Sequence, residues 1–129
     1  MALTFIPTTG TNTTPGGGAG WGAWTDVATC TVSSDCSFMV DDIFLIGKGP
    51  SGETATYKGA HRGKRVSGTT TLIQSIYMIL PFSAGSDTTV NSCTAQLVVS
   101  GTNLILQVKA PTSIAVNMTW YGGFTLIKF

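Results

Sequence analysis

Charged side chains are scarce in this sequence. Only 10% of its 129 residues are charged, whereas soluble domains average about 25%. So few charges leave a weakly solvated surface, even though Thr, Ser, Gly and Asn add polar groups. We therefore expect part of this surface to be covered in a larger assembly. The net charge of +1 gives no electrostatic reason to expect nucleic acid or an anionic membrane as a partner.

Long apolar runs and a secretory signal are also missing. A helix needs about 18 consecutive apolar residues to cross a bilayer, and the longest apolar clusters, at residues 43–46 and 76–82, are only strand-sized. The N-terminal residues lack the basic and apolar regions of a signal peptide. We expect a single domain that is made in the cytoplasm and kept there until it is assembled or released.

Cysteine and histidine are too few for a disulfide framework or a zinc site. The odd count of three cysteines, Cys30, Cys36 and Cys93, argues against a closed set of bridges. Free buried thiols are favoured in a cytoplasmic protein, and a Cys30–Cys36 bridge remains the alternative. One histidine, His61, and no Cys-x-x-Cys spacing predict no metal site.

No arrangement of residues with catalytic chemistry stands out. His61 lies alone in a basic, glycine-flanked stretch, and Asp41-Asp42 is the only carboxylate cluster. Neighbours in a strand point to opposite faces, so these two carboxylates do not converge on a substrate. Residues 48–52 lack the spacing of a phosphate-binding loop, and Pro50 removes a backbone donor. The sequence predicts no enzyme, no cofactor and no metal.

Residues 95–120 carry the clearest fold signal. Apolar residues alternate with polar ones in three stretches that are separated by Ser-Gly-Thr-Asn and Ala-Pro-Thr-Ser. Period-two spacing with such breaks predicts an antiparallel meander of three strands. Its apolar face must pack on another layer. We expect Val116, Met118 and Trp120 to be buried against Phe44, Leu72 and Ile76.

The rest of the chain also reads as strands. They are predicted at residues 24–32, 37–47, 55–66 and 69–82, and a last strand at residues 124–129 follows a bulge or bend at Tyr121-Gly122-Gly123. Together with the meander this gives about eight strands and no helix. The predicted fold is all-β, a single antiparallel β-sandwich or jelly-roll-like domain over residues 24–129.

Residues 1–23 differ in composition from the predicted domain. They are rich in Thr and Gly, with the glycine-rich run at residues 15–20, so they predict an extended N-terminal arm or a disordered tail. In the first case the apolar residues Leu3, Phe5 and Ile6 form a hook that docks on a neighbouring subunit. Trp21 and Trp24, at the inner end, favour docking because tryptophan is costly to leave in water.

Two polar features interrupt the predicted strands. Asp41-Asp42 breaks an apolar run and predicts a β-bulge or bend, with a cation or arginine partner as the alternative. The strand at residues 55–66 concentrates positive charge, which suits either a solvated edge strand or contact with an acidic partner surface. Its basic residues are Lys58, His61, Arg62, Lys64 and Arg65.

The order of these motifs resembles a small β-sandwich module of tailed-bacteriophage structural proteins, found in tail-fibre or appendage proteins and in capsid-associated proteins. The resemblance lies in DDIFLIGKGPSGETATY, YKGAHRGKR, and VSGTNLILQV followed by VNMTWYGGFTLIKF. It covers residues 38–65 and 95–129, roughly half of the chain. The low charge departs from such modules and favours lateral packing over a freely exposed position.

The resemblance implies a virion protein made in the host cytoplasm. The favoured role is a capsid cement or decoration protein, expected to be a homotrimer whose arm clamps neighbouring copies of the major capsid protein. A tail-fibre, tail-tip or receptor-binding component is the alternative, and a free carbohydrate-binding module is less favoured because spacing reveals no exposed face of converging aromatics. The residues predicted to bind partners are Leu3, Phe5, Ile6, Trp21, Trp24, Lys58, Arg62, Lys64 and Arg65.

Overall fold

The computed structural model describes residues 2–15, 23–79, 93–110 and 116–129, with the backbone alone at residues 74–79. No helix in these ranges is long and apolar enough to span a membrane. The described strands are β1 (Thr4–Thr14), β2 (Thr25–Thr31), β3 (Cys36–Lys48), β4 (Thr54–Val66), β5 (Thr69–Ile79), β6 (Thr94–Ser100), β7 (Asn103–Lys109) and β8 (Met118–Lys128).

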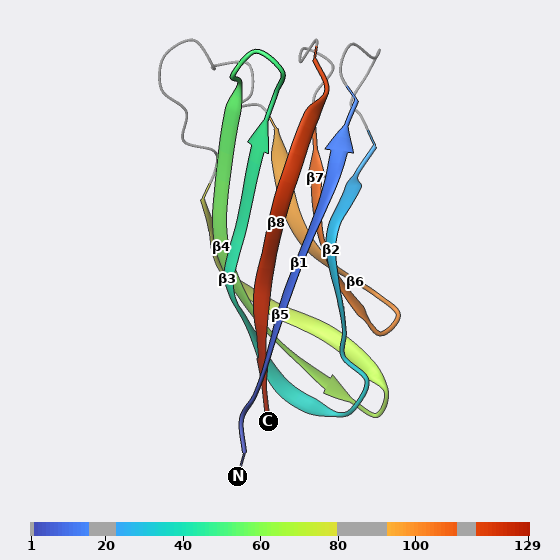
Figure 1. The fold of residues 1–129 in the computed structure, drawn as a ribbon. Helices are drawn as coiled ribbons and strands as arrows, with labels where there is room; N and C mark the ends of the chain where they lie inside the picture. The colour runs from blue at the N-terminus through green and yellow to red at the C-terminus, as the bar shows by residue number, and fades with distance from the viewer. Residues whose placement is uncertain (1, 16–22, 80–92, 111–115) are drawn as a thin grey trace.

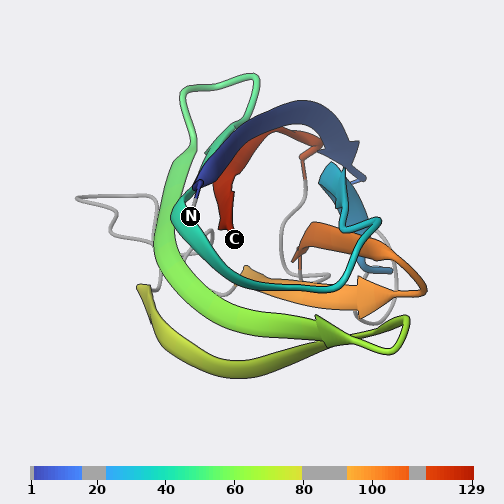
Figure 2. The same ribbon diagram turned by 90° about the horizontal axis from the view of Figure 1, so that it is seen from below.

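The strands form two antiparallel sheets that pack face to face (Figure 1). The larger sheet has the order β1-β8-β3-β4-β5, and the smaller has the order β2-β7-β6. Seen from below, the larger sheet curls around the smaller one, with β1 and β5 at opposite ends of the curl (Figure 2). The predicted all-β sandwich is therefore confirmed.

The core lies between the sheets, and Trp120 of β8 is its largest fully buried side chain. The Trp120 Nε1–H donates a hydrogen bond of 2.9 Å to Thr14 Oγ1 of β1, which satisfies the polar group of this large aromatic residue. The Tyr57 ring lies 6.0 Å away, centroid to centroid, tilted by 48°. Met118 is also fully buried, so the expectation that Met118 and Trp120 face the core is confirmed.

Residues 4–14 of the N-terminal segment form a strand of the domain. Residues 1–23 were predicted to form an arm, but β1 pairs with β8 from Thr4↔Lys128 to Thr14↔Met118. The Asn12 Nδ2 donates a 2.8 Å hydrogen bond to the Asp26 carbonyl of β2, which ties β1 to the second sheet as well. Thr-rich composition, taken as a sign of an arm, also suits a strand because threonine is β-branched.

The C-terminal segment contains one strand where two were predicted, and the predicted bend at Tyr121-Gly122-Gly123 is wrong. β8 runs without interruption between β1 and β3. A Cβ atom on Gly122 would lie 2.6 Å from the Phe44 carbonyl oxygen, and one on Gly123 would collide with the Thr8 carbonyl oxygen. The glycines thus allow the neighbouring strands to approach closely. The predicted three-stranded meander is also wrong, since β8 leaves β6 and β7 for the other sheet.

The predicted bulge at Asp41-Asp42 is confirmed. The β3–β4 register shifts between Val40 and Ile43, and Asp42 has a positive φ of 50°. One extra residue reverses which side chains face the core, so Ile43 is buried while Phe44 turns to the outer face. The expected burial of Phe44 in the core is therefore wrong. Leu72 packs on the core as expected, and the Ile76 side chain lies outside the described residues.

The basic strand is not at an edge. β4 lies between β3 and β5, so its charges cannot serve to discourage pairing at a free edge. Their role must be sought on the face of the sheet.

We expect Gly123→Ala to loosen β1 selectively, because the added methyl group would push the Thr8 carbonyl away. The free energy of unfolding should fall by roughly 1–3 kcal/mol, the usual cost of overpacking. Hydrogen exchange should show lower amide protection in β1 than in β4. Thr125→Ala, on the same strand and face, is the control, and equal protection of β1 in both variants would contradict the close-approach argument.

Candidate functional site

The outer face of the larger sheet carries side chains in rows that cross the strands. Phe5 of β1 lies opposite Ile127 of β8, which lies opposite Met39 of β3. Met39 in turn lies opposite Arg62 of β4. Because directly opposite residues share one face of a sheet, these side chains form a row that is apolar over three strands and positive on the fourth.

An exposed apolar surface surrounds this row at the end of the sandwich where both termini lie (Figure 1). The side chains of Leu3, Phe5 and Phe129 are 55%, 60% and 59% exposed. The Phe129 N–H and carbonyl pair with the Ser37 backbone, which brings Phe129 beside β3. We call Leu3, Phe5, Met39, Ile127 and Phe129 the apolar end patch.

Positive charge flanks the apolar end patch along β4. Lys58, Arg62 and Lys64 are exposed, and β4 contains no acidic residue. Ser37 pairs with Lys64 and Met39 pairs with Arg62, so these two cations lie directly beside the patch. The structure thus places Leu3 and Phe5 of the predicted apolar hook and Lys58, Arg62 and Lys64 of the predicted basic strand on one surface.

A depression of about 370 Å³ lies further along the same face, and we call it the central hollow. It is lined by residues 7–9 of β1, Asp42 and Phe44 of β3, Lys58 of β4 and residues 124–125 of β8. Gly123 of β8 lies opposite both Thr9 and Phe44. The Phe44 ring, which lines the hollow, lies 5.8 Å from the Tyr121 ring, centroid to centroid.

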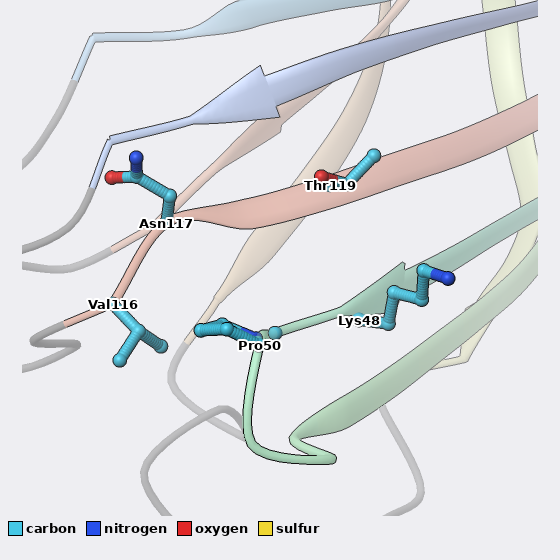
Figure 3. Close-up of a pocket in the computed structure, with 6 residues that line it drawn as sticks. Lys48, Pro50, Val116, Asn117 and Thr119 are labelled. Carbon is cyan, nitrogen blue, oxygen red and sulfur yellow. The ribbon is translucent and has the colours of Figure 1, made fainter.

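A second opening of about 520 Å³ lies at the other end of the sandwich. Figure 3 shows that the Val116 methyl groups point toward Pro50, across a gap between the β3–β4 connection and the start of β8. Thr119 and Asn117 line it on the β8 side.

The other residues predicted to bind partners lie elsewhere. Ile6 is half-buried and packs on the domain's own core. Trp24 is exposed beside the smaller sheet, with the Lys109 Nζ 5.2 Å from its ring centroid. Trp21 lies outside the described residues.

Arg65 is bound within its own domain. Its Nη1 donates to the Val32 carbonyl at 2.9 Å and to Thr70 Oγ1 at 3.3 Å, and its Nε lies 3.7 Å from the Asp35 carboxylate. Asp35 also accepts hydrogen bonds from the Ser67 and Gly68 N–H groups at 2.8 and 3.1 Å. These contacts hold the β2–β3 loop against the β4–β5 turn, so Arg65 has a structural role.

The buried titratable groups are held in their neutral forms. Burial, with a smaller effect of the nearby Cys93, raises the pKa of Tyr57, and burial raises the pKa of the Cys93 thiol to about 11. Burial also lowers the pKa of His61. All three cysteines are free thiols. Among the described residues, no group of three or more His, Cys, Asp or Glu is placed to hold a metal ion.

The outer face of the larger sheet was mostly not predicted from the sequence. Phe44 was expected in the core because the reversal of facing after the Asp41-Asp42 bulge was not followed along β3, and Met39 and Ile127 were not assigned to any surface. The pair Gly122-Gly123 was the signal for close packing of β1 and β3 on β8, since adjacent glycines in a strand indicate close backbone approach.

Comparisons with known proteins give one structural likeness. No family model and no curated protein matches the chain. Among solved structures, the tailspike protein of Acinetobacter baumannii phage AM24 is similar over 98% of this chain and 26% of the tailspike chain, with a TM-score of 0.48 and 14% identity. The chain thus spans about a quarter of the tailspike's length, and we draw no functional argument from this likeness.

We expect the Asp35 network to make stability depend on acidic pH. The Gly68 and Ser67 N–H groups and, to a lesser extent, Arg65 lower the pKa of Asp35 from its ordinary value of 3.8. The stabilisation is therefore complete above pH 3.8 and is lost as the pH falls through the lower pKa of the folded state. The free energy of unfolding, measured with urea between pH 2 and 7, should fall less steeply toward acidic pH in the Asp35→Asn variant than in the parent protein.

Asp42→Asn is the matched control, because the structure shows no hydrogen bond or ion pair to the Asp42 carboxylate among the described residues. If Asp42→Asn reduced this pH dependence of the free energy of unfolding as much as Asp35→Asn did, the contacts of Asp35 would not be its cause.

Proposed function

We propose that this chain is a non-enzymatic structural protein of a tailed-phage virion, and first of all a capsid cement or decoration protein. It sits on the shell as an oligomer, expected to be a trimer, and stabilises the shell by contacting the major capsid protein. The resemblance of its motifs to virion β-sandwich modules supports the phage assignment. The structural observation that supports this proposal is the apolar end patch.

The apolar end patch has the composition of a protein–protein contact. Its three most exposed members, Leu3, Phe5 and Phe129, are each more than half exposed, whereas soluble monomers rarely keep large contiguous apolar patches in water. Covering them removes apolar surface from water at about 25 cal/mol for each Å² buried. Two of these residues belong to the N-terminal segment, so this segment supplies the contact without leaving its own sheet.

The positive charge beside the patch indicates what kind of surface its partner has. Lys64 and Arg62 flank the patch, and β4 carries no acidic side chain. An apolar surface with an acidic border is the complement of such a patch, because opposite charges steer the encounter and like charges disfavour wrong partners. We therefore assign the patch to the contact with the capsid protein and place self-association on a different surface.

The tail is the alternative location, as a fibre, tail-tip or receptor-binding component. The two locations differ in the number of copies per particle. Quantitative mass spectrometry of purified virions should give hundreds of copies for a protein that covers the shell and roughly a dozen or fewer for a tail component. A copy number in the lower range would overturn the capsid assignment while leaving a virion role intact.

We expect Phe5→Ser and Lys64→Glu each to weaken binding to shells purified without this protein. Because apolar anchors and their charged neighbours dominate such contacts, the dissociation constant should rise about tenfold or more. Co-sedimentation across a salt series measures it, and Lys64→Glu should also reduce the salt dependence. Both side chains are exposed, so the free energy of unfolding should change by less than about 0.5 kcal/mol.

Ile46→Ser is the matched control for Phe5→Ser, because Ile46 is 50% exposed but lies near the far end of β3, away from the patch. Unchanged shell binding by both patch variants would overturn the assignment of the patch. Deletion of residues 1–20 is a poor test, since it removes β1 and the Thr14 hydroxyl that pairs with Trp120.

A further inference from the structure

The central hollow is a groove across the middle of the sheet. The Phe44 ring forms an aromatic wall, and Phe124 and Thr125 line the hollow from β8. Thr9 lies at the β1 end and Lys58 at the β4 end of the row that crosses Gly123. Its volume of about 370 Å³ falls in the range of small-molecule sites, about 300–1,000 Å³.

The polar groups of the hollow are available to a ligand. The bulge in β3 places Asp42 at the rim with a φ of 50°, and bulges commonly redirect a side chain next to a functional site. Among the described residues, neither the Asp42 carboxylate nor the Lys58 ammonium has a hydrogen bond or ion pair within the chain. The hydroxyls of Thr9 and Thr125 add groups that both donate and accept.

The charged groups, hydroxyls and aromatic ring of the central hollow indicate which class of ligand it binds. Asp42 and Lys58 carry opposite charges, so the hollow has no net charge with which to favour a phosphate or a lone cation. A carboxylate accepts hydrogen bonds from hydroxyl groups, an ammonium donates to them, and the aromatic wall offers an apolar surface for a ring carrying C–H groups. We propose that the central hollow binds a neutral polyhydroxylated ring, that is, one sugar unit.

The sugar site is separate from the apolar end patch. Phe5 and Thr9 are four residues apart on β1, which corresponds to about 13 Å along a strand. A partner on the patch and a sugar in the hollow can therefore be bound at once. The proposal does not depend on a virion location, and its failure would leave the proposed contact of the patch untouched.

Titration of the ¹⁵N-labelled full chain with neutral methyl glycosides of glucose, galactose and N-acetylglucosamine tests the proposal. Saturable shifts of the amide signals of Gly123, Phe44 and Thr125 are expected with at least one of them. Asp42→Asn and Lys58→Gln should each raise the dissociation constant about tenfold, as expected for the loss of one charge-assisted hydrogen bond. Asparagine tolerates a positive φ, so Asp42→Asn keeps the bulge.

Lys48→Gln is the control, since Lys48 is an exposed lysine of the same strand as Phe44 but does not line the hollow. The absence of saturable shifts at these amides with every glycoside at millimolar concentrations overturns the proposal. Equal affinity of Asp42→Asn, Lys58→Gln and Lys48→Gln for the glycoside also overturns it. Free glycine is added as a zwitterionic probe, and tighter binding of glycine than of any glycoside would identify an amino-acid site instead.

Discussion

The burial of Trp120 is the constraint on which the rest of the structure depends. Its indole lies between the sheets and needs both a partner for its N–H and space for its rings. Thr14 supplies the acceptor. Gly47, opposite it on β3, supplies the space, since a Cβ atom there would lie 2.6 Å from the ring. Because Thr14 is the last residue of β1, the tryptophan holds the N-terminal strand in the domain.

The shape of the outer face depends on how β1, β3 and β8 pack around Trp120. Glycines at positions 122 and 123 let β1 and β3 approach β8 closely. The bulge at Asp41-Asp42 lets Val40 and Ile43 both face the core and thereby turns Phe44 outward, next to Tyr121. The features that make the core compact thus also shape the surface to which we assign binding.

Local sequence patterns predicted some of these features well. The alternation around Met118 and Trp120 identified the core face of β8, and the acidic pair in an apolar run identified the bulge. The same patterns failed at β1 and β8, where pairing between strands distant in the sequence sets the structure. Residues 1–23 were predicted to form an arm because of their Thr- and Gly-rich composition, although residues 4–14 form β1, which is held mainly by backbone pairing with β8. The tally of eight strands agreed only because β1 was missed and β8 was divided in two.

The all-β fold, the burial of Met118 and Trp120 in the core and the weakly solvated surface could all be predicted before the structure was known. These properties depend on composition and on spacing within one strand. Only the tertiary structure decided that Phe5, Met39 and Ile127 form one row beside Lys64, and that Asp42 and Lys58 flank the same hollow. Such neighbours come from strands far apart in the chain, and their register is set by backbone pairing, the bulge and the glycines of β8 together.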